Sequence, residues 1–132
     1  RMRIRELDAG DARMRLDGGE TDLPEGLHRL VEYAQLATRR HGFDPMDRAV
    51  GDLAADTIRS TEHWHDAWPL RRQYGLSPDL LAMSMAWRSG EAVHEVAAKG
   101  APEAIAGLCH LAPSQAEPHL RRAAEMASRG LR

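Results

Sequence analysis

The sequence predicts a mainly α-helical domain, a compact multi-helix bundle of about six helices with an N-terminal β-hairpin. Three observations indicate this fold class. Apolar residues recur every three or four positions from Leu23 onward, proline and glycine interrupt the chain at helix-length intervals, and a two-residue period is confined to residues 1–19. The length of 132 residues suits one hydrophobic core, so we expect a single domain spanning residues 1–132.

Residues 1–19 are expected to form the hairpin. Apolar and charged residues alternate in MRIREL and again in ARMRL, on the two sides of the turn signal Ala9-Gly10-Asp11. An isolated hairpin is marginally stable in water, so this one must pack on helices or join another sheet. Because an unpaired strand edge accepts another strand, the hairpin is the first expected contact for a protein partner or a second copy of the chain.

Residues 22–131 are expected to form the helical body. Asp44 and Pro45 are a cap-and-proline start for a long helix that ends before Pro69, and Ser114 with Glu117 has the spacing of a capping box. The expected helices, separated by glycine, proline or cap residues, are 22–42, 44–68, 77–90, 91–99, 102–111 and 114–130.

Composition and charge limit the classes of function. Seventeen arginines stand against one lysine, Lys99, and alanine is abundant, which is typical of a GC-rich bacterial genome. Arginine content is therefore weak evidence for nucleic-acid binding, and the net charge of −2 does not support RNA or DNA as the main partner. A local basic patch is compatible with both observations.

The single cysteine, Cys109, cannot form an internal disulfide and lies among apolar residues in AIAGLCHLA. We expect a buried, unreactive thiol and a reducing compartment. No apolar run approaches the ~20 residues of a membrane span, so we expect a cytoplasmic protein without membrane contact. The start at Arg1 instead of methionine leaves open that the chain is a piece of a longer protein.

The segment TEHWHDAW, residues 61–68, suggests a metal site. Glu62 and His65 share a Glu-x-x-His pattern, as do Glu91 and His94, and Glu32 could add a further carboxylate, which is the donor set of di-iron and di-manganese helical bundles. A metal-binding bundle enzyme using iron or manganese is therefore the alternative hypothesis. Against it, a helix over 44–68 would point Glu62 about 120° away from the apolar stripe and out of the bundle.

The favoured interpretation of the same segment needs no cofactor. Trp64 and Trp68 lie one helical turn apart and would pack as buried aromatic anchors. Neighbouring side chains would then present charge and stacking planes to a partner. This expected recognition surface consists of His63, Arg71, Arg72 and Tyr74.

One stretch resembles a known family. PDLLAMSMAWRSGEAVHEVAAKG, with its Trp-x-x-Gly step, is similar to the helical C-terminal region of Ski2-like RNA helicases, and the likeness extends over residues 63–131. It departs from the family at KGAPEAIAG, where the family usually has Gly-Asp followed by an apolar-Arg step. The resemblance implies an accessory helical domain that packs on a motor and helps to guide RNA; the chain itself carries no motor motif.

No complete catalytic motif is present in the sequence. We therefore expect a non-enzymatic interaction or accessory module that binds a protein partner, forms a homo-oligomer or assists a nucleic-acid-handling complex.

Overall fold

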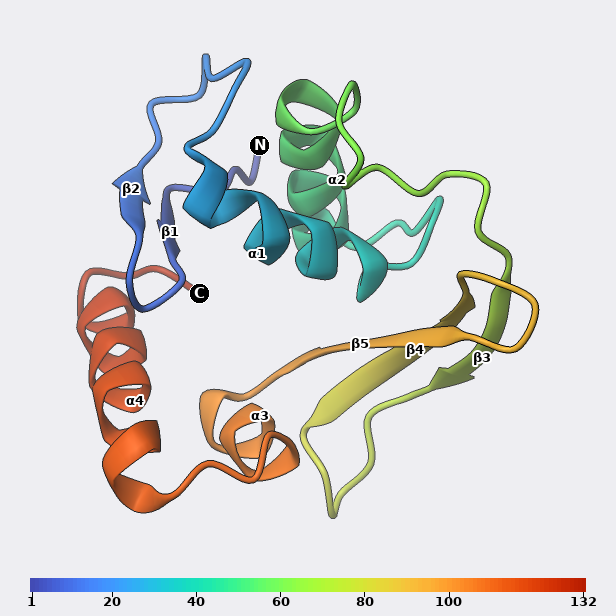
Figure 1. Ribbon diagram of the computed structural model, residues 1–132. Coiled ribbons are helices and arrows are strands. Elements are labelled where there is room, and N and C mark those ends of the chain that lie inside the picture. Colours follow the sequence, from blue (N-terminus) through green and yellow to red (C-terminus); the bar gives the residue numbers. More distant parts are fainter.

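The computed structural model describes all residues, 1–132, and shows a mixed α and β fold. The expectation of a mainly α, six-helix bundle is wrong, because the chain forms four helices and five strands in two antiparallel sheets. In Figure 1, α1 lies between the hairpin and the larger sheet. The elements are β1 (Glu6–Asp8), β2 (Arg13–Arg15), α1 (Glu25–Leu36), α2 (Pro45–Thr57), β3 (Leu70–Tyr74), β4 (Ala82–Arg88), β5 (His94–Gly100), α3 (Pro102–Leu108) and α4 (Pro113–Ser128).

The N-terminal hairpin is present where the alternating pattern predicts it. β1 and β2 pair antiparallel with Leu7 opposite Met14, and Gly10 adopts a positive φ of 93° in the turn between them. The hairpin packs on the first of two core clusters, which joins it to α1 and the end of α2. The buried members of this cluster are Leu16, Leu23, Leu27, Val31, Ala54 and Ile58.

α2 begins as predicted but is much shorter than predicted. The Asp44 carboxylate accepts a hydrogen bond from the Met46 amide at 2.7 Å, and Pro45 occupies the first turn. The helix ends at Thr57, so the expectation of one helix over 44–68 is wrong. Ile58 leaves helical geometry with a φ of −122° and is completely buried in the core. Burial of this β-branched side chain, together with the low helix propensity of Thr57, favours ending the helix there.

The larger sheet replaces two predicted helices, 77–90 and 91–99. Its order is β3-β4-β5, and β4 pairs with β5 without interruption from Ala82 opposite Gly100 to Arg88 opposite His94. The helix prediction failed because alanine and methionine are good helix formers and Trp87 also satisfies a helical spacing. In the structure, Met85 and Trp87 are buried and alternate with partly buried neighbours, as on a strand, and they face α1.

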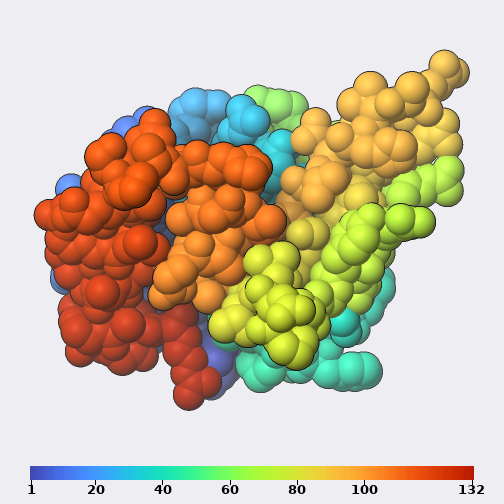
Figure 2. All heavy atoms as spheres, turned by 90° about the horizontal axis from the view of Figure 1, so that it is seen from below, coloured from blue at the N-terminus to red at the C-terminus, as the bar shows by residue number.

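Only one face of this sheet is covered. Met85, Trp87 and Ala97 pack on the end of α1, whereas Val96 and Tyr74 are exposed. Figure 2 shows the larger sheet at the surface, coloured lime to pale orange, with α3 beside it and α4 on the other side of α3.

The C-terminal helices agree with the predicted positions, but α3 ends at Leu108, earlier than expected, and α4 starts at Pro113 with a different cap. α3 and α4 have prolines in their first turns, and the Gln115 side chain accepts a hydrogen bond from the Ala112 amide at 2.9 Å, so the expected Ser114–Glu117 box does not form. Cys109 follows α3 and is exposed, so the expectation of a buried thiol is wrong. No helix has both the length and the apolar character that crossing a membrane requires.

Candidate functional site

Glu32 on α1 holds two histidines of the TEHWHDAW segment. Its two carboxylate oxygens lie 2.8 Å from Nδ1 of His63 and 2.6 Å from Nε2 of His65. All three side chains are largely buried. The segment reaches α1 because the chain leaves α2 at Ile58 and returns as irregular structure, not as a helix.

The environment of His63 favours its charged form. The pKa of His63 is raised, chiefly because the Glu32 carboxylate accepts its hydrogen bond; burial opposes this, and the charges of Glu62 and Glu25 add to the increase. His65 stacks face to face on Trp68, with ring centroids 3.6 Å apart. The carboxylate and the stacked ring together fix the path of this loop.

The structure divides the residues expected for a di-metal centre. Glu32 and His65 are in contact, while Glu62 extends an exposed side chain beside His63. Glu91 lies in the β4–β5 turn, and His94 begins β5 with its side chain exposed. Neither makes a polar contact with the other three. The two Glu-x-x-His segments therefore belong to different parts of the fold.

The expected recognition surface is also divided. Arg71, Arg72 and Tyr74 lie on the edge strand β3, where every residue is exposed, and an Arg72 guanidinium nitrogen donates to the Tyr74 hydroxyl at 3.3 Å. His63 instead faces Glu32, with only 18% of its side chain exposed. Arg71, Arg72 and Tyr74 therefore form a basic and aromatic strand edge of which His63 is not a part.

A second polar site involves the chain's only lysine. Lys99 on β5 forms an ion pair with Asp47 in the first turn of α2, which links the end of the sheet to the start of that helix. The Asp47 side chain is 8% exposed and the Lys99 side chain 31% exposed, so the ion pair is largely buried.

Apolar side chains near this pair remain in contact with solvent. The strand register places Lys99 opposite Met83 and Gly100 opposite Ala82, next to the exposed Leu81. Phe43 and Met46, just before and at the start of α2, are also exposed, as is Leu76 in the β3–β4 connection. We call the residues next to this pair along the chain and the strands the Lys99 surface; it comprises Phe43, Met46, Asp47, Leu81 and Lys99.

The Lys99 surface was not predicted from the sequence. One signal was available: the chain has a single lysine among seventeen arginines, and its compact ammonium group differs in geometry from a guanidinium. Its partner Asp47 could not be found from the sequence, because the two residues are far apart in the chain and meet only when β5 pairs with β4.

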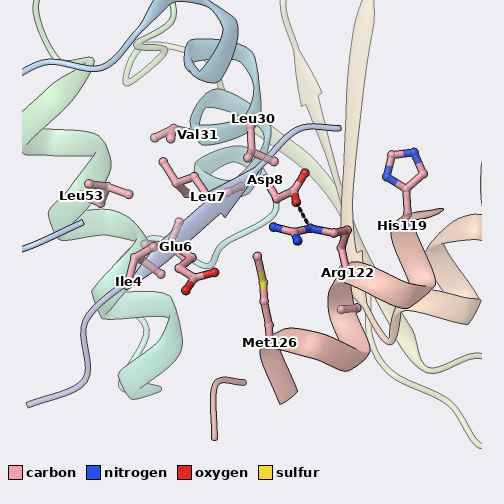
Figure 3. A pocket seen from close by; sticks show the side chains of 13 residues that line it. Ile4, Glu6, Leu7, Asp8, Leu30, Val31, Leu53, His119, Arg122 and Met126 are labelled. Atoms are coloured by element: carbon pink, nitrogen blue, oxygen red, sulfur yellow. Dashed lines mark hydrogen bonds and ion pairs between the residues drawn. The ribbon is translucent and has the colours of Figure 1, made fainter. Parts of the chain in front are cut away.

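An apolar cavity of about 340 Å³ lies between the hairpin, α1, α2 and α4. Figure 3 shows Ile4, Leu7 and Met126 around it and the hydrogen bond from Arg122 to Asp8 at its edge. Burial raises the pKa of Asp8, but hydrogen bonds from Arg122 and Gly10 outweigh it and lower the pKa overall. Because Asp8 and Arg122 satisfy each other, we interpret the cavity as a seam where α4 rests on the hairpin.

Comparisons with protein-family models, curated proteins and solved structures yield no match. The Ski2-like resemblance implied two helices joined at the Trp-x-x-Gly step, and the structure has strands β4 and β5 there.

Proposed function

We propose that this chain is a non-enzymatic binding module and that its ligand site is the Lys99 surface. The observation that carries the proposal is the partly buried Asp47–Lys99 pair next to exposed apolar side chains. Exposed apolar groups beside oriented polar groups are typical of binding sites, because the apolar area supplies affinity and the polar groups supply orientation.

The chemistry of the site suits a planar nitrogen heterocycle. Beyond its ion pair with Asp47, the Lys99 ammonium keeps two N–H donors, and the second carboxylate oxygen of Asp47 remains an acceptor, so a ring with neighbouring donor and acceptor atoms, such as a purine base, matches both. Leu81 and Met46 provide apolar contacts for the ring faces.

An arginine near Asp47, Arg39, could bind an anionic substituent of the ligand. Arg39 borders Gly42, whose Cβ would lie 3.4 Å from the Arg39 Cβ and 3.3 Å from a carboxylate oxygen of Asp47. The Arg39 side chain therefore begins near Asp47; its exposed guanidinium lies beside the Gln73 side-chain amide on β3 and would have to turn from Gln73 to meet a ligand seated on Asp47. Guanidinium groups bind phosphate well, so we propose a purine nucleotide as the ligand class.

The direct test is titration of the full chain with ATP and with adenosine, followed by backbone amide NMR. We expect shifts concentrated at Phe43–Asp47, Leu81–Met83 and Lys99, and weaker binding of adenosine because it lacks the phosphates. Shifts scattered over the arginine-rich surface, or none at millimolar ATP, would overturn the proposal.

Matched variants sharpen the test. Leu81→Glu places a negative charge at an exposed position of the Lys99 surface and should weaken ATP binding at least tenfold, while Leu108→Glu makes the same change on α3, away from the surface. Lys99→Arg keeps the ion pair with Asp47 but changes the donor geometry, and it should also weaken binding. Equal affinity in all four proteins would contradict the assignment.

The exposed edge of β3 favours a second candidate function, binding of a protein partner or of a second copy of the chain. All five residues of this strand are exposed, and its outer edge carries no paired strand. Native mass spectrometry across a concentration series tests self-association; a monomer at every concentration would remove the second copy as an occupant.

We also propose a reducing, cytoplasmic location, which the free, exposed thiol of Cys109 supports. Labelling of this thiol in intact cells of the source organism with membrane-permeant and membrane-impermeant maleimides would test it. Labelling by the impermeant reagent would contradict a cytoplasmic location.

A further inference from the structure

Three hydrogen-bond acceptors converge where the TEHWHDAW segment meets the start of α1. Nδ1 of His28 lies 3.4 Å from one carboxylate oxygen of Glu25, and Nε2 of His63 lies 3.9 Å from the other. The two imidazole rings meet edge to face with centroids 5.4 Å apart. One ligand atom from each of the three residues falls within 4.8 Å of the others.

The second nitrogen of each ring makes a hydrogen bond that leaves the converging nitrogen free. Nε2 of His28 lies 2.7 Å from the Leu23 carbonyl, which can only accept, so this nitrogen carries the proton. Nδ1 of His63 lies 2.8 Å from the Glu32 carboxylate, which favours the proton there. In the neutral rings, Nδ1 of His28 and Nε2 of His63 therefore present lone pairs toward Glu25.

In the neutral form this arrangement leaves acceptors facing acceptors, whereas in the protonated form Nε2 of His63 faces the Glu25 and Glu62 carboxylates as a donor. Nε2 of His63 is buried and has no hydrogen-bond partner, and the His28 side chain is only 10% exposed. Buried polar atoms normally have a partner, so a cation placed between these atoms would satisfy all of them at once.

We propose that Glu25, His28 and His63 bind one Zn²⁺ ion, with Glu32 and the Leu23 carbonyl orienting the two histidines. A carboxylate or a backbone carbonyl on the non-ligating nitrogen is the usual support of a zinc-bound histidine. Two imidazoles and one carboxylate are a donor set that zinc prefers, whereas magnesium and calcium prefer oxygen alone.

The distances allow the site to form with small movements. Zinc bonds of about 2.0–2.2 Å in a tetrahedron hold ligand atoms about 3.3–3.6 Å apart. The His28–Glu25 separation of 3.4 Å already fits, and the Glu25 side chain, 82% exposed, is free to turn toward His63. The fourth position falls to water or to Glu62, whose carboxylate lies 3.4 Å from Nε2 of His63.

Bound zinc would restrain the irregular connection between α2 and β3. His63 belongs to the connection between α2 and β3, and the other two ligands belong to the first turns of α1. The ion would therefore hold this connection on α1. The site shares no residue with the Lys99 surface, so each proposal can fail without the other.

Calorimetric titration of the chelator-treated full chain with Zn²⁺ at pH 7.5 is the first experiment, since zinc binds the deprotonated form of a histidine. We expect one ion per chain, a rise in the thermal unfolding temperature, and the intense visible absorption of tetrahedral cobalt when Co²⁺ replaces zinc. No binding at millimolar Zn²⁺, or cobalt spectra of octahedral type only, would overturn the proposal.

Conservative variants locate the ion. Glu25→Gln changes an exposed side chain and should preserve the fold while lowering zinc affinity at least tenfold; His63→Gln should abolish one-to-one binding. Glu91→Gln and His94→Gln are the matched controls, because both residues are exposed in the β4–β5 region. Loss of binding in the controls, or unchanged affinity in Glu25→Gln and His63→Gln, would refute the site.

Discussion

The indole nitrogen of Trp87 donates a hydrogen bond of 2.7 Å to the backbone carbonyl of Leu36, and this bond joins the middle strand of the larger sheet to the end of α1. Both residues are buried, and the Arg40 guanidinium lies 4.4 Å from the centre of the Trp87 ring. The bond satisfies a helix-end carbonyl that has no partner within the helix. Trp87 thus contributes both packing and a hydrogen bond to the attachment of the sheet, beside the packing of Met85 and Ala97 on α1 and the Lys99–Asp47 ion pair.

The first prediction concerns this bond. Trp87→Phe keeps an aromatic ring but leaves the Leu36 carbonyl buried without a partner, so the free energy of unfolding should fall by about 1–3 kcal/mol. Urea denaturation followed by circular dichroism measures the change. Trp64→Phe is the matched control: Trp64 packs on the other core cluster, and its indole makes no hydrogen bond to the protein. An equal loss in both variants would mean that ring volume, not the bond, accounts for the effect.

The second prediction concerns Gly100. A Cβ added there would lie 2.3 Å from the Leu81 carbonyl oxygen and 2.6 Å from the Ala82 Cα, which is too close for either backbone atom. Gly100→Ala should therefore separate the ends of β4 and β5 and destabilise the protein by about 1–3 kcal/mol.

Gly107→Ala provides the comparison for Gly100→Ala. No atom lies within 4 Å of the added Cβ at Gly107, and this residue is in α3, so the same change should be neutral or should stabilise the protein by up to about 1 kcal/mol. Thermal unfolding of the two variants measures both effects. A tolerated Gly100→Ala would show that the strands do not approach as closely as described.

The third prediction concerns pH. The folded-state pKa of His63 is raised, mainly by Glu32, so the folded protein binds more protons than the unfolded chain between the unfolded value of about 6.5 and the folded value. The stabilisation is fully present below the unfolded pKa and is lost as pH rises through the folded pKa. Glu25, Glu62 and the neighbouring His28 also face this ring.

Unfolding measured with chelator present checks this pH dependence. The wild type should become more stable relative to Glu32→Gln as pH is lowered from 8 to 6, because the variant cannot stabilise the protonated ring as a carboxylate does. A constant difference between the two proteins over this range would contradict the assignment to Glu32.

The fourth prediction concerns the contact between the hairpin and α4. Arg122 donates to Asp8 at 2.8 Å, and the Asp8 side chain is only 10% exposed. Arg122→Leu leaves this carboxylate without its charged partner, and we expect a loss of about 1–2 kcal/mol after allowing for the partial exposure of Arg122. Hydrogen exchange should quicken most in α4. Arg121→Leu, which breaks only the exposed pair with Glu117, should change little.

The sequence predicted those parts of the fold whose signals are local. The hairpin followed from alternation around Gly10, the start of α2 from Asp44 and Pro45, and the positions of α3 and α4 from proline and glycine. Each signal acts within a few residues, through turn geometry, a capping hydrogen bond or a fixed φ.

The candidate sites were less accessible to this reasoning. The TEHWHDAW segment was recognised as rich in metal-binding groups, and Glu32 was named with it. His28 and Glu25, which complete the proposed zinc site, were not predicted. Residues 61–68 were expected on a helix over 44–68, but in the structure that helix ends at Thr57 and the segment turns back to α1. The wrong helix prediction therefore gave the wrong spatial neighbours for His63 and His65.

Local sequence alone determined the hairpin, the start of α2 and the positions of α3 and α4, since a turn or a cap depends on adjacent residues; α1, expected over 22–42, is shorter and spans Glu25–Leu36. Tertiary structure decided that residues 82–100 form strands, that Lys99 meets Asp47 and that His63 turns toward His28. The physical reason is that a segment such as AMSMAWR satisfies both a helical and an alternating pattern. Its state is then chosen by burial of Met85 and Trp87 against α1 and by pairing with β5, interactions that come from distant parts of the chain.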